Sequence, residues 1–560
     1  MKVFVQGRGE VSLGQGDYLA SGGFGDVYAK GDIAYKIYQD PNNMIPVQKI
    51  DELSVLGDPN IIRPLEVLLD PRKHTPIGYT MRYLKDTYSL CQLFPKAFRD
   101  RTGLTPEQTL KLVQVLQGQV KHCHSKGVVM VDLNEMNELV SKNFSELYTI
   151  DVDNFKTRSF PAQGLMDSVK DWHANGHYDE KSDWFSFAVV VFNLFFGIHP
   201  YKGKHPQYNL IERMKHNVTV RDPAVHYPRG SVLPFDVAPE VYLRWLDAVL
   251  TGGQRLAPPE DLTAKIVLVT KLQQVVGSNN LEFTKLQEFA EKLVAYYYGM
   301  QHQVAVTSEA IYLGSTRVMD VSPGTVVVTT PKLGVPIAVR IDHGSLKLMN
   351  IISKLPIAIN LITSQMAICD GRIVALSSGS FVEIEFLEIG GNIMATPKLV
   401  GNALERATTF YDGVAIQNLM GTWYADIFPG HGRHHIFKIL ESGWRVMDAR
   451  YRSGVLQVVA VNTAGKYSRF VFRFADDFSA SDVREVPDII PSGLNFIVRD
   501  NGVVVQINEQ SEIELFSGWM GSPDIKTIID PAVSADMRLS MRGASVVFTR
   551  GNELYSMRMR

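Results

Sequence analysis

The last part of the chain, residues 301–560, is built from short runs of β-branched residues, and this feature constrains the fold most. Runs such as those at 325–329 and 502–507 are rich in valine and isoleucine, and most are bounded by Gly, Asp, Asn or Ser. Helical spacing is almost absent there. A long series of short strands leaves two packed sheets, a large barrel or radial blades as possible architectures.

A strand, a tight turn and a second strand recur within this part of the chain. The clearest examples lie at residues 366–374, 494–504 and 539–547. Their separations fit multiples of roughly 40 to 45 residues, the range of propeller repeats. We therefore predict a β-propeller of about six blades; five or seven stay open because no WD or kelch signature fixes the count. No acid pair or nucleophile motif occurs there, so we expect a separable docking platform for a protein substrate or partner.

Charge and cysteine usage exclude several kinds of partner. The 560 residues have room for two or three domains, and the net charge is −2 without a basic tract. We therefore expect neither nucleic acid nor a membrane surface as partner. Cys91, Cys123 and Cys369 are far apart, and no signal peptide or bilayer-long apolar run occurs. These features predict a cytoplasmic protein.

The first part of the chain changes from strands to helices. Short strands up to about residue 84 precede long segments with helical spacing, and Thr105, Pro106 and Gln108 form a good helix start. Residues 283–294 also have helical spacing. We predict a two-lobed α+β domain at 1–262 with the first lobe ending near 84, a helical linker at 263–300 and the propeller at 301–560.

Two polar segments lie in the second lobe. Residues 131–137 read VDLNEMN, and residues 150–153 read IDVD after an interval that fits a β-hairpin. They offer Asp132, Asn137, Asp151 and Asp153. Magnesium prefers such hard oxygen ligands, and the phosphates of a nucleotide supply further ones.

These segments resemble the catalytic loop and the metal-binding segment of protein kinases. The resemblance implies that Asp132 orients the substrate hydroxyl and that Asn137 and Asp151 bind Mg²⁺. Val131 replaces the arginine that usually receives an activation-loop phosphate. Asp153 either caps a turn, which we favour, or supplies a third oxygen to the metal.

An earlier segment, residues 19–28, resembles the kinase glycine-rich loop with Ala20 in place of its first glycine. Residues 33–36 resemble the kinase strand that carries the ATP-binding lysine, here Lys36, which shares a strand face with Tyr38. The helix glutamate that should pair with this lysine falls on Lys49, and we expect Glu52 or Asp51 to substitute. The resemblance implies that ATP contacts a set of residues in the first lobe: Ala20, Gly22, Gly23, Gly25, Val27, Lys36, Met81, Tyr83 and Leu84.

The resemblance covers about residues 15–262. The particular residues of these motifs are similar to those of divergent bacterial and phage Ser/Thr kinase-like proteins. Near 183 it implies that Asp183 supports the catalytic-loop backbone from the start of a buried helix. The implied function is an ATP- and Mg²⁺-dependent Ser/Thr protein kinase in which Lys36 and Asp132 are catalytic. Two alternatives stay open. Lys49, Asn134 and Val131 favour a pseudokinase scaffold, and the unusual segment 154–182 leaves a small-molecule substrate possible.

Three histidines, His431, His434 and His435, lie within residues 429–435. Such a cluster raises the question of a metal site. No carboxylate or cysteine lies within residues 429–435, so we expect a solvated, glycine-flanked loop.

Overall fold

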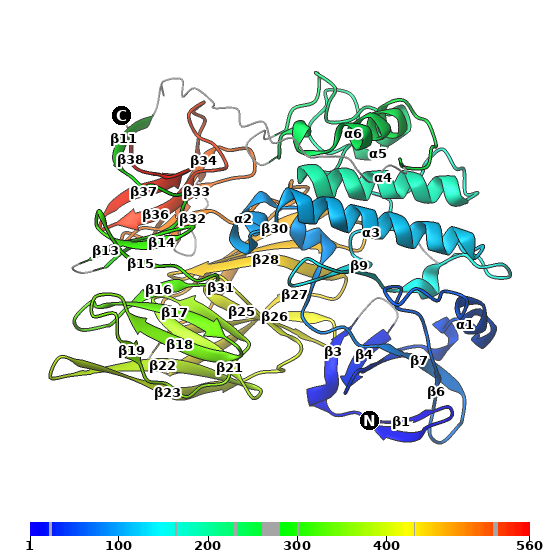
Figure 1. Ribbon diagram of the computed structural model, residues 1–560, viewed down its shortest axis with the longest axis horizontal. Helices are drawn as coiled ribbons and strands as arrows, with labels where there is room; N and C mark the ends of the chain where they lie inside the picture. Colours follow the sequence, from blue (N-terminus) through cyan, green and yellow to red (C-terminus); the bar gives the residue numbers. More distant parts are fainter. Residues whose placement is uncertain are drawn as a thin grey trace.

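The computed structural model describes residues 1–21, 25–162, 165–227, 232–259, 281–299, 302–430, 432–518 and 525–559. The chain forms a mixed N-terminal region that is described up to residue 259 and a C-terminal region of strands that begins at residue 281 (Figure 1). In the part of the chain that the structure describes, we find no helix with the length and apolar character needed to cross a membrane.

The N-terminal region begins with a seven-stranded antiparallel sheet in the order β2-β1-β6-β7-β5-β4-β3. One apolar cluster on this sheet gathers buried side chains such as Val3, Val5 and Leu68. A short helix, α1 (Val47–Leu53), lies between β5 and β6 in the chain. The strands are β1 (Lys2–Val5), β2 (Gly9–Ser12), β3 (Tyr18–Ser21), β4 (Gly25–Lys30), β5 (Ile33–Tyr38), β6 (Val67–Leu69) and β7 (Pro76–Arg82).

Helices dominate the rest of the N-terminal region. They are α2 (Lys96–Thr102), α3 (Pro106–Ser125), α4 (Glu180–Phe196), α5 (Leu210–His216) and α6 (Glu240–Leu246), with a small sheet of β8 (Thr87–Ser89), β9 (Glu138–Ser141) and β10 (Leu147–Thr149). The predicted helix start is confirmed, because Thr105 caps α3 and accepts the Gln108 N–H at 3.2 Å. Helix α4 is buried along most of its length and ends at Gly197, whose φ is +74°.

The described C-terminal residues form seven antiparallel four-stranded sheets, in the orders β11-β38-β37-β36, β12 to β15, β16 to β19, β20 to β23, β24 to β27, β28 to β31 and β32 to β35. The first sheet joins the two ends of this region, because β11 pairs with β38. Strand β12 contacts β36, and β20 contacts β24, which in turn contacts β28. Neighbouring sheets thus touch through strands at the ends of their strand orders.

The strands of this region are β11 (Leu281–Glu288), β12 (Leu293–Tyr298), β13 (Gln303–Thr307), β14 (Ala310–Leu313), β15 (Thr316–Asp320), β16 (Val326–Thr329), β17 (Pro336–Asp342), β18 (Ser345–Asn350), β19 (Pro356–Ile357), β20 (Gln365–Cys369), β21 (Arg372–Ser377), β22 (Ser380–Ile389), β23 (Asn392–Asn402), β24 (Thr408–Tyr411), β25 (Val414–Leu419), β26 (Thr422–Gly430), β27 (Arg433–Leu440), β28 (Trp444–Arg452), β29 (Val455–Asn462), β30 (Tyr467–Phe474), β31 (Ser481–Val486), β32 (Phe496–Val498), β33 (Val503–Ile507), β34 (Ile513–Ser517), β35 (Ile525–Ile528), β36 (Arg538–Arg542), β37 (Ser545–Arg550) and β38 (Glu553–Met559).

The prediction of a helical linker at 263–300 is wrong for residues 281–299, the part of this range that the structure describes. Of residues 283–294, which have helical spacing, 283–288 lie in β11 and 293–294 in β12, with a connection between them, whereas 263–280 lie outside the described residues. The physical reason is tertiary: β11 pairs along its length with β38, and Leu281 is buried in the same cluster as Met557. Packing against a neighbouring strand overrides local propensity.

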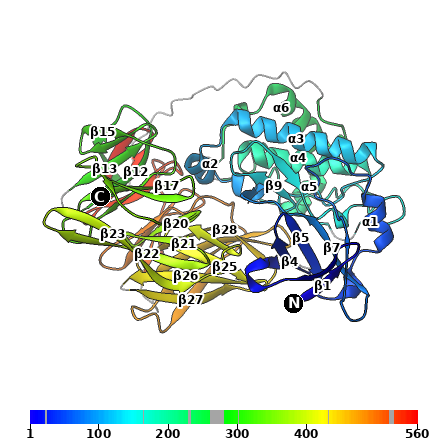
Figure 2. The ribbon, with the colours of Figure 1, turned by 60° about the horizontal axis from the view of Figure 1, so that its bottom comes forward.

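The two regions lie side by side (Figure 2) and share an apolar core. Met447, Val459 and Tyr467 of the C-terminal region belong to the same buried cluster as α3 and α4. Arg445 also donates to the carbonyl of Met136 at 3.0 Å. The C-terminal sheets therefore complete the core beneath the N-terminal helices.

Candidate functional site

Lys36 lies in β5 at the centre of a buried polar cluster. Its Nζ donates to Asp151 Oδ1 at 3.0 Å and to Asp153 Oδ2 at 2.8 Å. Its side chain is only 9% exposed. Burial would lower the pKa of Lys36, but the two carboxylates outweigh it and hold that pKa well above its ordinary value.

Asp153 is a partner of Lys36, so its preferred interpretation as a turn cap is wrong. The short 3₁₀ turn η4 (Val152–Asn154) has no side-chain cap. Asp153 Oδ2 also accepts the Tyr38 hydroxyl at 2.6 Å, and its side chain is 5% exposed. Burial opposes ionisation, yet Lys36 and nearby hydroxyls hold the pKa of Asp153 below its ordinary value.

Helix α1 contributes a lysine to this cluster where a glutamate was expected. Lys49 is 1% exposed and its Nζ donates to the Asp153 carbonyl at 2.7 Å. Glu52 instead accepts the Ser159 N–H at 3.1 Å, and Asp51 is exposed. The expectation that Glu52 or Asp51 replaces the helix glutamate is therefore wrong, because Asp153 is the carboxylate beside Lys36.

The residue directly before Asp132 has a strained backbone. Val131 has φ +61°, which is an outlier for a β-branched residue and costs about 1–3 kcal/mol. Asp183, fully buried at the start of α4, accepts the Met130 and Val131 N–H groups at 2.7 and 2.8 Å. His124 Nε2 lies 2.9 Å from the same carboxylate. The predicted supporting role of Asp183 is confirmed.

Hydrogen bonds connect Asp132 with the other predicted site residues. Asn137 Nδ2 donates to Asp132 Oδ2 at 3.3 Å, and the Asn137 carbonyl accepts the Ile150 N–H at 2.8 Å, directly before Asp151. Asp132 Oδ1 accepts the Met166 N–H at 2.9 Å. Burial raises the pKa of Asp132, and the Met166 and Asn137 contacts oppose that rise.

The arrangement fits a Mg²⁺ ion that a nucleotide brings with it. The side-chain Nδ2 of Asn137 donates to Asp132, so the side-chain amide oxygen of Asn137 can face a cation. The Asp151 side chain is 41% exposed, which leaves carboxylate oxygen accessible. Within the described ranges no group of three or more His, Cys, Asp or Glu residues could hold a metal by itself. Two protein oxygens suit an ion whose other ligands are phosphate and water.

Several predicted nucleotide contacts line the strands around Lys36. Val27 pairs with Lys36 across β4 and β5, and Ala20 pairs with Val27. Gly25 is needed by the sheet itself, since a Cβ there would lie 2.4 Å from the Ile37 carbonyl oxygen. Gly22 and Gly23 lie outside the described residues.

The segment predicted to hold adenine follows β7. Met81 pairs with Ala34 of β5. The Tyr83 N–H donates to the Asp32 carbonyl at 2.9 Å, so this group is not available to a base, whereas Leu84 is half-buried beside it. Binding of adenine by this segment stays a prediction.

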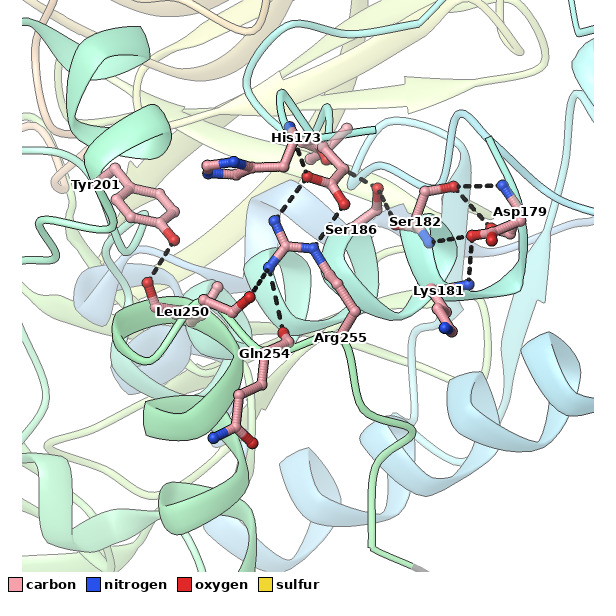
Figure 3. A network of polar contacts seen from close by, with 12 residues as sticks. His173, Asp179, Lys181, Ser182, Ser186, Tyr201, Leu250, Gln254 and Arg255 are labelled. Atoms are coloured by element: carbon pink, nitrogen blue, oxygen red, sulfur yellow. Dashed lines mark hydrogen bonds and ion pairs between the residues drawn. The ribbon is translucent and has the colours of Figure 1, made fainter. Parts of the chain in front are cut away.

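A clamp on residues 166–171 was missed by sequence reasoning. Arg255 binds Asp171 through Nε at 2.6 Å and Nη2 at 2.7 Å, and Ser186 donates to the Val169 carbonyl at 2.8 Å. Arg255 and Ser186 are labelled in the network of polar contacts in Figure 3. His199 Nε2 lies 2.7 Å from the Ser168 carbonyl oxygen. Arg255 is 84 residues from Asp171, and no local spacing connects the two.

The predicted solvated histidine loop is wrong for two of its three histidines. His434 Nε2 lies 2.7 Å from the buried Asp426 Oδ1, and its ring stacks on Phe428. His435 stacks on Phe478 with ring centroids 4.8 Å apart. His431 lies outside the described residues. The partner Asp426 comes from the preceding strand, β26, at a short distance in sequence.

Known proteins similar to this chain are protein kinases, although no protein-family model matches it. A probable LIM domain-containing serine/threonine-protein kinase of Dictyostelium discoideum is 26% identical over 204 residues, which are 33% of this chain and 30% of that protein. CBL-interacting protein kinase 5 of Oryza sativa subsp. japonica is 27% identical over 211 residues, 33% of this chain and 43% of that kinase. CBL-interacting protein kinase 15 of the same plant is 26% identical over 233 residues, 36% of this chain and 50% of that kinase. This chain thus spans half or less of these relatives, and its N-terminal region is kinase-like.

Proposed function

We propose that the N-terminal region is an ATP- and Mg²⁺-dependent protein kinase of the serine/threonine type. The observation that carries this proposal is the hydrogen bond from Lys36, in the first sheet, to Asp151, next to the segment in which Asn137 binds Asp132 and the Ile150 N–H. The kinase relatives support the same class. We also retain as proposals the similarity to bacterial and phage kinase-like proteins and a cytoplasmic location.

Each residue of this set has a distinct chemical role. Lys36 would neutralise phosphate charge beneath the strands β4 and β5. Asp151 and the amide oxygen of Asn137 would hold Mg²⁺, and bound Mg²⁺ neutralises charge on the phosphoryl group. Asp132 would accept or orient the substrate hydroxyl, and its raised pKa makes its carboxylate a better proton acceptor.

We further propose that the seven C-terminal sheets are the blades of a propeller. Pairing of β11 with β38 supports this, because joining the two ends of the region is how a ring of blades closes. The sequence predicted about six blades and left five or seven open, and seven sheets are described. The blades would dock a protein substrate or partner.

A pseudokinase scaffold is the second candidate, and one contact favours it. The Met166 N–H occupies Asp132 Oδ1, the position where a substrate hydroxyl would bind. A scaffold would still bind nucleotide at Lys36 and Asp151.

Phosphoryl transfer separates the two candidates. Purified protein is incubated with labelled ATP and Mg²⁺, alone and with a generic basic protein, and nucleotide binding is followed by thermal shift. The kinase proposal expects both binding and transfer that Asp132→Asn removes. Binding without transfer supports the scaffold. No shift at millimolar ATP contradicts both.

A further inference from the structure

We propose that Asp153 and Lys49 are the positioning residues of Lys36, and this rests on the proposed phosphotransfer function. Asp153 supplies the carboxylate that holds the lysine, and Lys49 of α1 fixes the turn that carries Asp153. In this arrangement the helix orients the lysine through a backbone carbonyl, since it contributes no carboxylate of its own.

The contacts meet on one residue. The carboxylate of Asp153 binds Lys36 Nζ at 2.8 Å and the Tyr38 hydroxyl at 2.6 Å, while its carbonyl binds Lys49 Nζ at 2.7 Å. Lys36, Lys49, Tyr38 and Asp153 are all buried. Lys36 is paired with carboxylates, whereas Lys49 Nζ donates to the Asp153 carbonyl and, at 3.4 Å, to the Pro161 carbonyl. A buried lysine needs such partners, so each of the two restricts where the turn can lie.

The charge balance explains why a second carboxylate is needed. Lys36 also binds Asp151, but Asp151 is the more exposed of the two, 41% against 5% for Asp153. If Asp151 turns toward Mg²⁺, Lys36 keeps Asp153 as its counter-ion. Asp153 thereby frees Asp151 for the metal without leaving a buried, unpaired ammonium group.

The first test uses the protein without nucleotide. Acetylation of Lys36 by acetic anhydride is followed by peptide mass spectrometry at pH 8, with Lys202 as the reference lysine. Asp153→Asn should raise the labelling rate of Lys36 about tenfold, because its amine loses one of its two carboxylate partners. A general loosening of the fold would raise the labelling of Lys202, whose side chain is 11% exposed, by the same factor.

Glu52→Gln is the matched control, because Glu52 is an acidic residue of the same helix α1 that binds the Ser159 N–H instead of Lys36. Its Lys36 labelling rate should equal that of the unchanged protein. An unchanged Lys36 rate in Asp153→Asn, or an equal rise in Glu52→Gln, would overturn the assignment.

The second test concerns the metal and keeps the proposal falsifiable if Asp153→Asn does not fold. Binding of a fluorescent ATP analogue is titrated with Mg²⁺ for Lys49→Met and Lys49→Arg. Lys49→Met should raise the Mg²⁺ concentration for half-maximal binding about tenfold, because residues that orient a metal site from outside its ligand set typically contribute about 10–100-fold to metal affinity, and Lys49→Arg should restore it. An unchanged Mg²⁺ requirement in Lys49→Met contradicts the role of Lys49. If the unchanged protein binds no ATP at any Mg²⁺ concentration, the proposed function fails, whereas the labelling result still decides the role of Asp153.

Discussion

The two regions of the molecule use left-handed backbone in different ways. In the C-terminal region, residues 343–344 and 370–371 have positive φ at both positions and join consecutive strands. Ser378, Met420 and Ser453 also precede a positive-φ glycine in two-residue turns. Such turns match the twist of the strands, and glycine takes the second position without steric cost. These hairpins need left-handed backbone only to reverse the chain.

In the N-terminal region, two left-handed residues lie beside the candidate site. Val131 and Asp151 have φ +61° and +55°, and neither precedes a glycine. They flank the polar cluster of Asp132 and Lys36, and buried Asp183 holds the first of them. In these examples the same dihedral angles reverse the chain where glycine follows, whereas at Val131 they belong to the candidate site, where a buried carboxylate holds the backbone.

The largest expected effect tests whether the two regions are separable. A chain that ends at residue 259 loses Met447, Val459 and Tyr467 from the core shared with α3 and α4. We expect it to be insoluble or to unfold without a cooperative transition, because large apolar surfaces of the helices become exposed. Solubility and thermal melting measure this. A truncated protein with the melting temperature of the full chain would restore the idea of a separable docking platform, which the sequence favoured.

The second prediction concerns Asp132, which directly follows the strained residue Val131. Asp132→Asn should reduce phosphoryl transfer on the order of a thousandfold, since general base catalysis contributes about 10²–10⁴. ATP affinity should stay nearly unchanged, because the Asp132 side chain contacts Asn137 and Met166 and not Lys36. Transfer rates and ATP thermal shifts are compared with those of Asp151→Asn, which should also lose Mg²⁺-dependent binding. Full transfer by Asp132→Asn would contradict the assignment.

The sequence predicted those features that depend on local pattern. The cap at Thr105 and the hairpin at 366–374 follow from spacing and turn residues, and the structure confirms them. The supporting contact of Asp183 followed from the kinase resemblance, and it is confirmed as well.

The features that sequence reasoning missed depend on residues far apart in the chain. Asp153 meets Lys36 across 117 residues, and the strand β11 forms only because β38 lies beside it. Arg255 and Asp171 are likewise distant. No local signal distinguishes a turn-capping aspartate from one that binds a buried lysine, so this part of the candidate site required the structure.

The third prediction compares one buried carboxylate from each region. Asp183→Asn keeps the side-chain volume but places an amide group where two backbone N–H groups need acceptors, and we expect a loss of about 3 kcal/mol of unfolding free energy. Asp426→Asn, whose partners are His434 and Gln417, is the matched variant in the C-terminal region. Both should lower stability in denaturant titrations, and only Asp183→Asn should weaken phosphoryl transfer. Equal loss of transfer in both would break the comparison.

The fourth prediction concerns pH and the clamp on residues 166–171. Burial lowers the pKa of His199 to about 4, so the folded protein binds fewer protons there than the unfolded chain between about pH 4 and its ordinary pKa of about 6.5. Stability should therefore fall with acidification, by about 2–3 kcal/mol from pH 7 to pH 4.5 for this group. His199→Gln should reduce that loss by the same amount, as measured by denaturant titration at both pH values. Identical pH dependence in both proteins would show that His199 titrates normally.

The smallest expected effect is a difference in stability between substitutions at two turn glycines, one of which also lies against the N-terminal region. Gly465 has φ +72°, and a Cβ there would lie 2.5 Å from Ser168 Oγ, whereas Gly344 with φ +74° has nothing within 4 Å. Asparagine tolerates left-handed backbone, so the variants differ mainly in this contact. Gly465→Asn should cost about 1–2 kcal/mol more than Gly344→Asn, because the added side chain presses on residues 166–168 beside Asp132.

Limited proteolysis should show faster cleavage near residue 166 in Gly465→Asn alone. The added side chain would push on Met166 and Ser168 and so loosen residues 166–168, whose Met166 N–H contacts Asp132. If the segment blocks the substrate, the same variant should also raise phosphoryl transfer relative to Gly344→Asn. Equal stability and equal cleavage in the two variants would mean that Gly465 serves only its turn. The C-terminal region would then contact the segment without restraining it.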